Sequence, residues 1–365
     1  MPLAIPHYKV VTDSINQHAV GTVSDTLRAF SKVTVCGHIS DEQNVLQQDF
    51  NGTIFPSVYD KSMMVSTLEN DPGSYPFSFE VQKSILFKGN NTVKNGYFTF
   101  SFYLPKDINY DYGNGKISYY ARSSNSDAAG AYTDIIIGGT DTSGLDDKEG
   151  PEIELFLNDE SFVNGGIVNS TPILIAKIKD NYGINTTGNG IGHDLTAVID
   201  ELSDSQVILN DFYQTEKDSF NMGTVRYQLG EQTAGKHTIM LRAWDINNNH
   251  SEKELTFEVI SDQKLMLSHV LNYPNPFTTH TEFFFEHNQP GGVFDVQVQV
   301  YTISGKLLKT INTTQVLEGN RSQPIPWDGL DDAGDKIGKG VYMYRLRVRN
   351  ENLETAETVE KLVIL

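Results

Sequence analysis

The sequence predicts an all-β fold built from three consecutive immunoglobulin-like β-sandwich domains. Apolar and polar residues alternate with a period of two in most segments, and no convincing amphipathic helix is longer than two turns. Turn signals such as Asn-Gly and Gly-Gly separate these segments. A chain of 365 residues suits two to four domains. We therefore expect an entry segment followed by three domains, at residues 1–24, 25–145, 146–262 and 263–365.

Composition and charge narrow the class of protein. Hydrophobic residues make up 38% of the chain and aromatic residues 10%, so each domain has enough apolar side chains for a core. The net charge of −19 argues against nucleic-acid binding, which needs a basic face. The one cysteine, Cys36, excludes a disulfide within the chain. We expect no transmembrane segment, because no apolar run is long enough.

The first predicted domain is a sandwich over residues 25–145. Its clearest strand runs from Tyr97 to Leu104, where the apolar side chains at every second position share one face. The Asn-Gly pair at 95–96 predicts a tight turn into this strand. A short apolar run from Ile135 to Ile137 adds another strand before the polar boundary segment.

The second predicted domain is an immunoglobulin-like sandwich over residues 146–262. Several short strands with turn signals between them are typical of that fold. The clearest strands are those at Ile153–Leu157, Ile173–Lys179, His237–Trp244 and Glu254–Ile260.

Five motifs follow one another in the third predicted domain. They are LNYPNPF (Leu271–Phe277), VYTISGKLL (Val300–Leu308), WDGLDDAG (Trp327–Gly334), GVYMY (Gly340–Tyr344) and KLVIL (Lys361–Leu365). The two prolines of the first motif fix φ and remove ladder donors, which predicts an edge or a linker. The Ser-Gly pair of the second motif predicts a hairpin turn.

In this order, the five motifs resemble the type IX secretion C-terminal domain of Bacteroidetes, a small immunoglobulin-like sandwich. The resemblance implies that the module serves as an address for sorting or docking. The same motifs also suit a folding signature of one small sandwich, and both interpretations stay open for each residue. The residues implied in sorting or docking are Tyr273, Pro274, Asn275, Pro276, Phe277, Gly305, Lys306, Trp327, Gly340, Tyr342, Lys361, Leu362, Val363, Ile364 and Leu365.

Further segments resemble the PorU-like sortases of type IX secretion, in the gingipain-type cysteine peptidase family. LAIP (Leu3–Pro6) resembles the end of the peptidase domain, which makes residues 1–24 the end of that domain or a linker from it. NGTIFP (Asn51–Pro56), PKDIN (Pro105–Asn109) and YGNGKISY (Tyr112–Tyr119) are similar to the non-catalytic region that follows. The chain would then be the C-terminal part of such an enzyme, with its export signal elsewhere.

The resemblance also implies a function and a location. The full enzyme would remove C-terminal domains from cargo and transfer the cargo to an anionic lipopolysaccharide. This chain would support its own upstream peptidase domain and dock on an outer-membrane β-barrel attachment protein. It would lie on the extracellular face of the bacterial outer membrane, reached through the periplasm. The alternative is an adhesin or glycan-binding fragment of another type IX secreted surface protein.

We expect no catalytic residue and no cofactor in this chain. Cys36 and His38 are two positions apart on a predicted strand and share a face, but a nucleophile needs a strained turn and an oxyanion hole. No histidine has the spacing of a zinc site. Calcium is a candidate metal, because residues with oxygen ligands crowd the first domain boundary, although solvated linker charge explains them too. The candidate ligands are Asp141, Asp146, Asp147 and Glu149.

Overall fold

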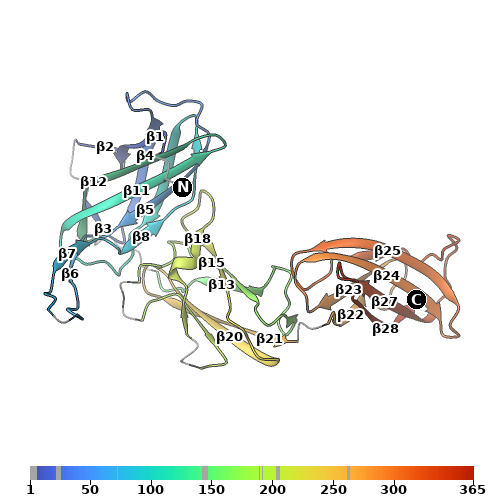
Figure 1. Ribbon diagram of the computed structural model, residues 1–365. Coiled ribbons are helices and arrows are strands. Elements are labelled where there is room, and N and C mark those ends of the chain that lie inside the picture. Colours follow the sequence, from blue (N-terminus) through green and yellow to red (C-terminus); the bar gives the residue numbers. More distant parts are fainter. Residues whose placement is uncertain are drawn as a thin grey trace.

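The structure, a computed structural model, describes residues 6–21, 26–71, 73–141, 147–188, 190, 192–202, 206–260 and 264–365. These residues form strands β1 to β28 and one short 3₁₀ helix, η2 (Asn210–Phe212). The prediction of an all-β protein is confirmed. Within these ranges, no helix has the length and the apolar character needed to cross a membrane. Figure 1 shows three β-rich bodies in chain order, with the second between the other two.

The first domain is a closed barrel. Seven strands follow one another around it in the order β1, β4, β10, β9, β5, β11 and β12, and β12 pairs with β1 to close the ring. Strands β2, β3 and β8 extend this sheet. The strands are β1 (Tyr8–Ile15), β2 (His18–Ala19), β3 (Thr26–Ala29), β4 (Lys32–Ser40), β5 (Gly52–Tyr59), β8 (Ile85–Lys88), β9 (Asn91–Lys94), β10 (Tyr97–Tyr103), β11 (Gly113–Ser123) and β12 (Asp127–Thr140).

The barrel corrects two predictions. The sandwich expected over residues 25–145 is wrong, because one sheet closes on itself. The expectation that residues 1–24 are the end of the peptidase domain or a linker from it is wrong for β1, which pairs with β4 and β12 and buries Val10 and Ile15. A barrel and a sandwich share the same alternation of side chains. They differ in strand stagger and tilt, which alternation does not encode. Residues 1–5 and 22–25 lie outside the described residues, so the LAIP motif is described only at Pro6.

The barrel interior is filled by aromatic and branched side chains from alternate positions. Phe98, Phe100 and Phe102 on β10 point inward, as the alternation predicts. Gly37 on β4 makes room for Phe98, because a Cβ at this position would clash with that ring and with the carbonyl oxygen of Val11. Thus a glycine inside a strand marks a close approach of a side chain.

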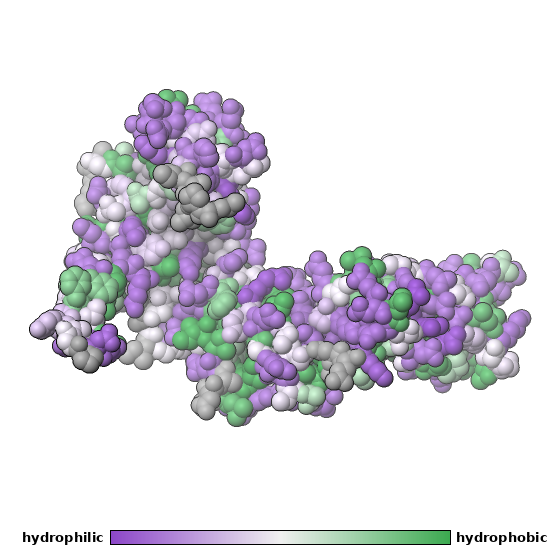
Figure 2. Space-filling model, in the orientation of Figure 1, coloured by the Kyte–Doolittle hydropathy of each residue, from purple (hydrophilic) through white to green (hydrophobic). Residues whose placement is uncertain are grey.

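A hairpin projects from the barrel. Strands β6 (Met63–Ser66) and β7 (Ser78–Val81) form a separate two-stranded sheet. The projection is seen near the β6 and β7 labels in Figure 1, and apolar side chains appear on it in Figure 2. Large exposed side chains here are Met63, Met64, Leu68, Tyr75, Phe77 and Phe79.

The second domain consists of two sheets around one core. One sheet has the order β13-β15-β19-β18 and the other β14-β21-β20-β16-β17. Inward side chains of both sheets belong to one hydrophobic cluster, among them Leu174 on β15 and Phe257 on β21. The strands are β13 (Glu152–Leu157), β14 (Ile167–Val168), β15 (Ile173–Lys179), β16 (Thr196–Ile199), β17 (Val207–Ile208), β18 (Tyr213–Thr215), β19 (Met222–Gln228), β20 (Gly235–Trp244) and β21 (His250–Val259).

The third domain also has two sheets, in the orders β22-β23-β26 and β25-β24-β27-β28. Its hydrophobic cluster draws only on residues between Leu265 and Ile364. Whether this domain and the second are immunoglobulin-like stays a prediction. The strands are β22 (Leu267–Tyr273), β23 (Thr281–His287), β24 (Gly292–Thr302), β25 (Leu307–Leu317), β26 (Ile325–Trp327), β27 (Gly340–Arg349) and β28 (Thr355–Ile364).

Candidate docking site

The aromatic residues of the C-terminal motifs meet in the core of the third domain. The Trp327 ring lies between Phe277 and Phe283, with ring centroids 5.6 and 6.1 Å away. Phe283 in turn packs against Tyr344, at 4.8 Å. Trp327 and Phe277 are each only 3% exposed. These residues therefore hold the fold together, which supports the folding interpretation of their motifs.

The first and the last motif contact each other directly. Asn275 Nδ2 donates to the carbonyl oxygen of Lys361, at 3.0 Å, and the backbone N–H of Val363 donates to Asn275 Oδ1, also at 3.0 Å. Beside them, Phe277 N–H donates to Val363 O and Leu365 N–H donates to Phe277 O. The segment after β22 therefore covers the end of β28, where an uncovered edge would leave backbone groups without partners.

Between these contacts, one group of side chains stays exposed. Tyr273 is 71% exposed and Leu365 57%, and Pro274, Pro276 and Lys361 are exposed as well. We call Tyr273, Pro274, Pro276, Lys361 and Leu365 the C-terminal patch. It combines apolar and aromatic surface with one positive charge, and such exposed apolar groups on a folded domain often mark an interaction site.

The remaining predicted residues lie at the same end of the third domain. Residue pairing places Gly340 opposite Ile364 on β28, and Tyr342 opposite both Leu362 and Thr302. The turn at Gly305 and Lys306 follows β24 at this end. Leu362 and Ile364 are buried, whereas Val363 is only partly buried, as period-two alternation requires.

The sequence did not identify two exposed apolar side chains near the C-terminal patch as candidate site residues. Val341, which pairs with Val363, is 38% exposed, and Leu271 on β22 is 44% exposed. Both lie inside recognised motifs. Strand alternation would have found Leu271, since it lies beside the buried Asn272. Val341 gives no such signal, because its neighbours Gly340 and Tyr342 are only partly buried.

Cys36 and His38 share the outer face of β4, as the sequence predicts, and each has another partner. Cys36 Sγ lies 3.4 Å from Thr99 Oγ1, and His38 Nδ1 lies 2.8 Å from Asp13 Oδ1. Both positions belong to the regular ladder between β4 and β10. The pair therefore lies within a strand and not at a turn. The absence of catalysis in this chain stays a prediction.

One of the calcium candidates joins an acidic cluster. Carboxylate oxygens of Asp147, Asp180 and Asp245 lie within 4.8 Å of one another, and Asp180 and Asp245 are buried. Asp141 and Glu149 do not belong to this cluster. Asp146 lies outside the described residues. Sequence spacing does not predict the cluster, because its members come from three segments that meet only in the fold.

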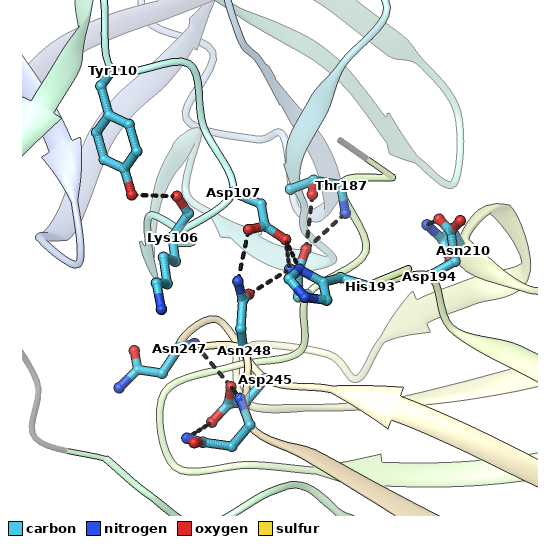
Figure 3. Close-up of polar contacts among 12 residues, drawn as sticks. Lys106, Asp107, Tyr110, Thr187, His193, Asp194, Asn210, Asp245, Asn247 and Asn248 are labelled. Carbon is cyan, nitrogen blue, oxygen red and sulfur yellow. Dashed lines mark hydrogen bonds and ion pairs between the residues drawn. The ribbon is translucent and has the colours of Figure 1, made fainter. Parts of the chain in front are cut away.

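Burial governs the electrostatics of this cluster. Burial, with a smaller contribution from the nearby Asp180 carboxylate, raises the pKa of Asp245 to about 6, although hydrogen bonds from Asn249 oppose the shift. Burial also raises the pKa of Asp180. Figure 3 shows Asp245 beside Asn247 and Asn248, in the turn between β20 and β21. Calcium binding by the chain stays a prediction.

The comparisons with known proteins give one informative similarity. No protein-family model and no curated protein sequence matches the chain. Among solved structures, the crystal structure of dimeric latent PorU from Porphyromonas gingivalis is 30% identical over 99% of this chain, with a TM-score of 0.45. The alignment covers 34% of the PorU chain, so this chain spans about a third of that protein. The chain is thus similar in sequence to a region of PorU.

Other solved structures match with much lower identity. One is SGBP-B of a Bacteroides ovatus mixed-linkage glucan utilization locus, in complex with a mixed-linkage heptasaccharide. It is 8% identical, the match covers 99% of this chain and 71% of that one, and the TM-score is 0.28. Another is a DUF4785 family protein from Legionella pneumophila, with 13% identity, coverage of 98% and 93%, and a TM-score of 0.25.

Proposed function

We propose that this chain is the non-catalytic C-terminal region of a PorU-like surface protein of type IX secretion, and that its third domain docks that protein on an outer-membrane β-barrel partner. The observation that carries the proposal is the convergence of the motifs: Asn275 and Phe277 bind the end of β28, and the C-terminal patch is exposed around that junction. The 30% identity to a third of PorU supports the same assignment.

Buried and exposed motif residues would have different roles. Buried side chains such as Phe277, Trp327 and Ile364 would keep the two sheets together, and the C-terminal patch would contact the partner. The C-terminal patch is largely apolar and has one lysine, which suits a protein partner, because apolar contacts supply affinity and a charge sets orientation. Catalysis, removal of cargo domains and transfer to lipopolysaccharide would belong to an upstream peptidase domain that carries its own Cys and His.

A pair of matched substitutions tests the docking role. Leu365→Asp introduces a charge into the C-terminal patch, whereas Val316→Asp introduces one at a residue that is 68% exposed near the opposite end of the same sheet. We expect Leu365→Asp to lower retention on the cell surface, and co-purification with the outer-membrane partner, at least tenfold. Val316→Asp should leave both unchanged, and both variants should melt at the parental temperature.

Equal retention of the two variants would contradict the docking proposal. A glycan array with the purified chain addresses the alternative. Specific glycan binding, together with unchanged retention of Leu365→Asp, would favour an adhesin or glycan-binding fragment.

A further inference from the structure

The barrel and the second domain contact each other in several places: Tyr103 packs on Tyr182 and Phe220, and Lys88 binds Asp211 and Thr215. Aspartate carboxylates hold two further places. At the first, the loop that follows β10 inserts Asp107 between loops of the second domain, as Figure 3 shows. At the second, Asp218 of the second domain reaches the barrel. Its carboxylate accepts bonds from Thr92 N–H and Thr92 Oγ1, both at 2.6 Å, and its own N–H donates to Asn90 O. We call these places the Asp107 contact and the Asp218 contact.

Asp107 binds donors from three segments of the second domain. Its Oδ2 accepts from Asn185 Nδ2 at 3.0 Å and lies 2.7 Å from His193 Nδ1. Its Oδ1 accepts from Asn248 Nδ2 at 2.8 Å. The Asp107 side chain is only 11% exposed. A carboxylate removed from water to this extent needs hydrogen-bond donors, and hydrogen bonds to an ionised acceptor are stronger than those between neutral groups.

Contacts within the second domain hold the groups that bind Asp107 in position. Asn185 Oδ1 accepts from Thr187 N–H and Thr187 Oγ1, so its Nδ2 is left to face Asp107. The His193 ring packs on Trp244, with centroids 4.4 Å apart. Both sets of contacts lie within the second domain. The second domain therefore presents a preformed socket, which lowers the entropic cost of docking.

A glycine allows the close approach. A Cβ at Gly190 would clash with Asp107 Oδ2 and with His193 Nδ1. The backbone next to Asp107 is also tied across the boundary, because Lys106 N–H donates to Ile246 O at 2.8 Å. The backbone N–H of Lys106 and the carboxylate of Asp107 thus both bind the second domain at this socket.

We propose that Asp107 is a clasp that holds the barrel and the second domain together as one rigid unit. Breaking the Asp107 contact releases the Asp218 contact as well, because the two domains separate as whole bodies. This inference concerns only the first two domains and does not depend on docking by the third.

Hydrogen exchange measures the clasp directly, because each contact includes a backbone N–H that donates across the boundary. Lys106 N–H reports on the Asp107 contact and Asp218 N–H on the Asp218 contact. In the full chain, Asp107→Ala should speed the exchange of both amides at least tenfold, and Asp107→Asn should speed it less. Asp111→Asn is the matched control, since it removes a charge from an exposed residue of the same loop. It should change neither amide.

A second variant tests the clasp while keeping all its polar groups. Gly190→Ala places a methyl group against Asp107 and should speed both amides as Asp107→Ala does. Gly230→Ala is its control, because a Cβ there meets no atom within 4 Å. Exchange of Leu241 N–H, in the core of the second domain, should stay slow in every variant. Unchanged exchange of both amides in Asp107→Ala, or faster exchange of Lys106 alone, would overturn the proposal.

Discussion

At the scale of single residues, burial determines which titratable groups make the stability of the protein depend on pH. His287 on β23 is fully buried beside Phe294, with ring centroids 4.3 Å apart, and burial lowers its pKa from 6.5 to about 4. Between these two pH values the unfolded chain binds more protons than the folded one. The histidine's contribution to stability is therefore complete above pH 6.5 and is lost as the pH falls through 4.

This shift predicts a pH dependence for the third domain. His287→Leu cannot be protonated, so it should remove the part of the acid destabilisation that His287 causes, up to about 3 kcal/mol. Denaturant unfolding at pH 7 and pH 4 measures the difference between variant and parent. His280→Leu, at an exposed histidine of the same domain, is the control and should leave the pH dependence unchanged. The same acid loss in parent and His287→Leu would contradict the assigned pKa.

At the scale of elements, we expect the removal of β1 to have the largest effect on the stability of the barrel. It buries Val10 and Ile15 and supplies the strand that closes the barrel between β4 and β12. Deleting residues 1–24 from the full chain should therefore open the barrel and abolish the heat-absorption peak of the first domain in calorimetry. The peak of the third domain should persist. A barrel that melts as before would mean that β1 is dispensable, as a linker would be.

Some features of the fold can be predicted from the sequence, and others cannot. Alternation identified the strands around Phe100 and Ile175, because a two-residue period is a local property. Closure of the barrel and the meeting of Asp147 with Asp245 depend on contacts between distant segments. Neither spacing nor composition reports such contacts. The residues proposed for docking lie between these cases: the sequence shows their motifs, but only the fold separates buried Phe277 from exposed Tyr273.

At the scale of the whole molecule, the third domain is the most independent part. Among the described residues, its hydrophobic cluster takes none from outside 265–364. A hydrogen bond from Asn158 to Asn320 is one of its contacts with the second domain. We expect a fragment of residues 264–365 to fold by itself. Well-dispersed amide signals in a nitrogen–proton correlation spectrum would confirm this, and collapsed, random-coil signals would contradict it. A fragment of the second domain would instead lose the Asp107 clasp.

The closed barrel also has a consequence for the order in which the chain acquires structure. Tyr8 pairs with Ala128 and Lys9 with Ala129, so the ring is completed by residues about as far apart in sequence as a small domain is long. Bringing such distant segments together is slow compared with forming a local hairpin. Strand β1 can pair with β4 as soon as both are present, but its pairing with β12 has to wait until β12 has been synthesised. Until then the edge of β1 that faces β12 lacks its partner strand, and the ring stays open.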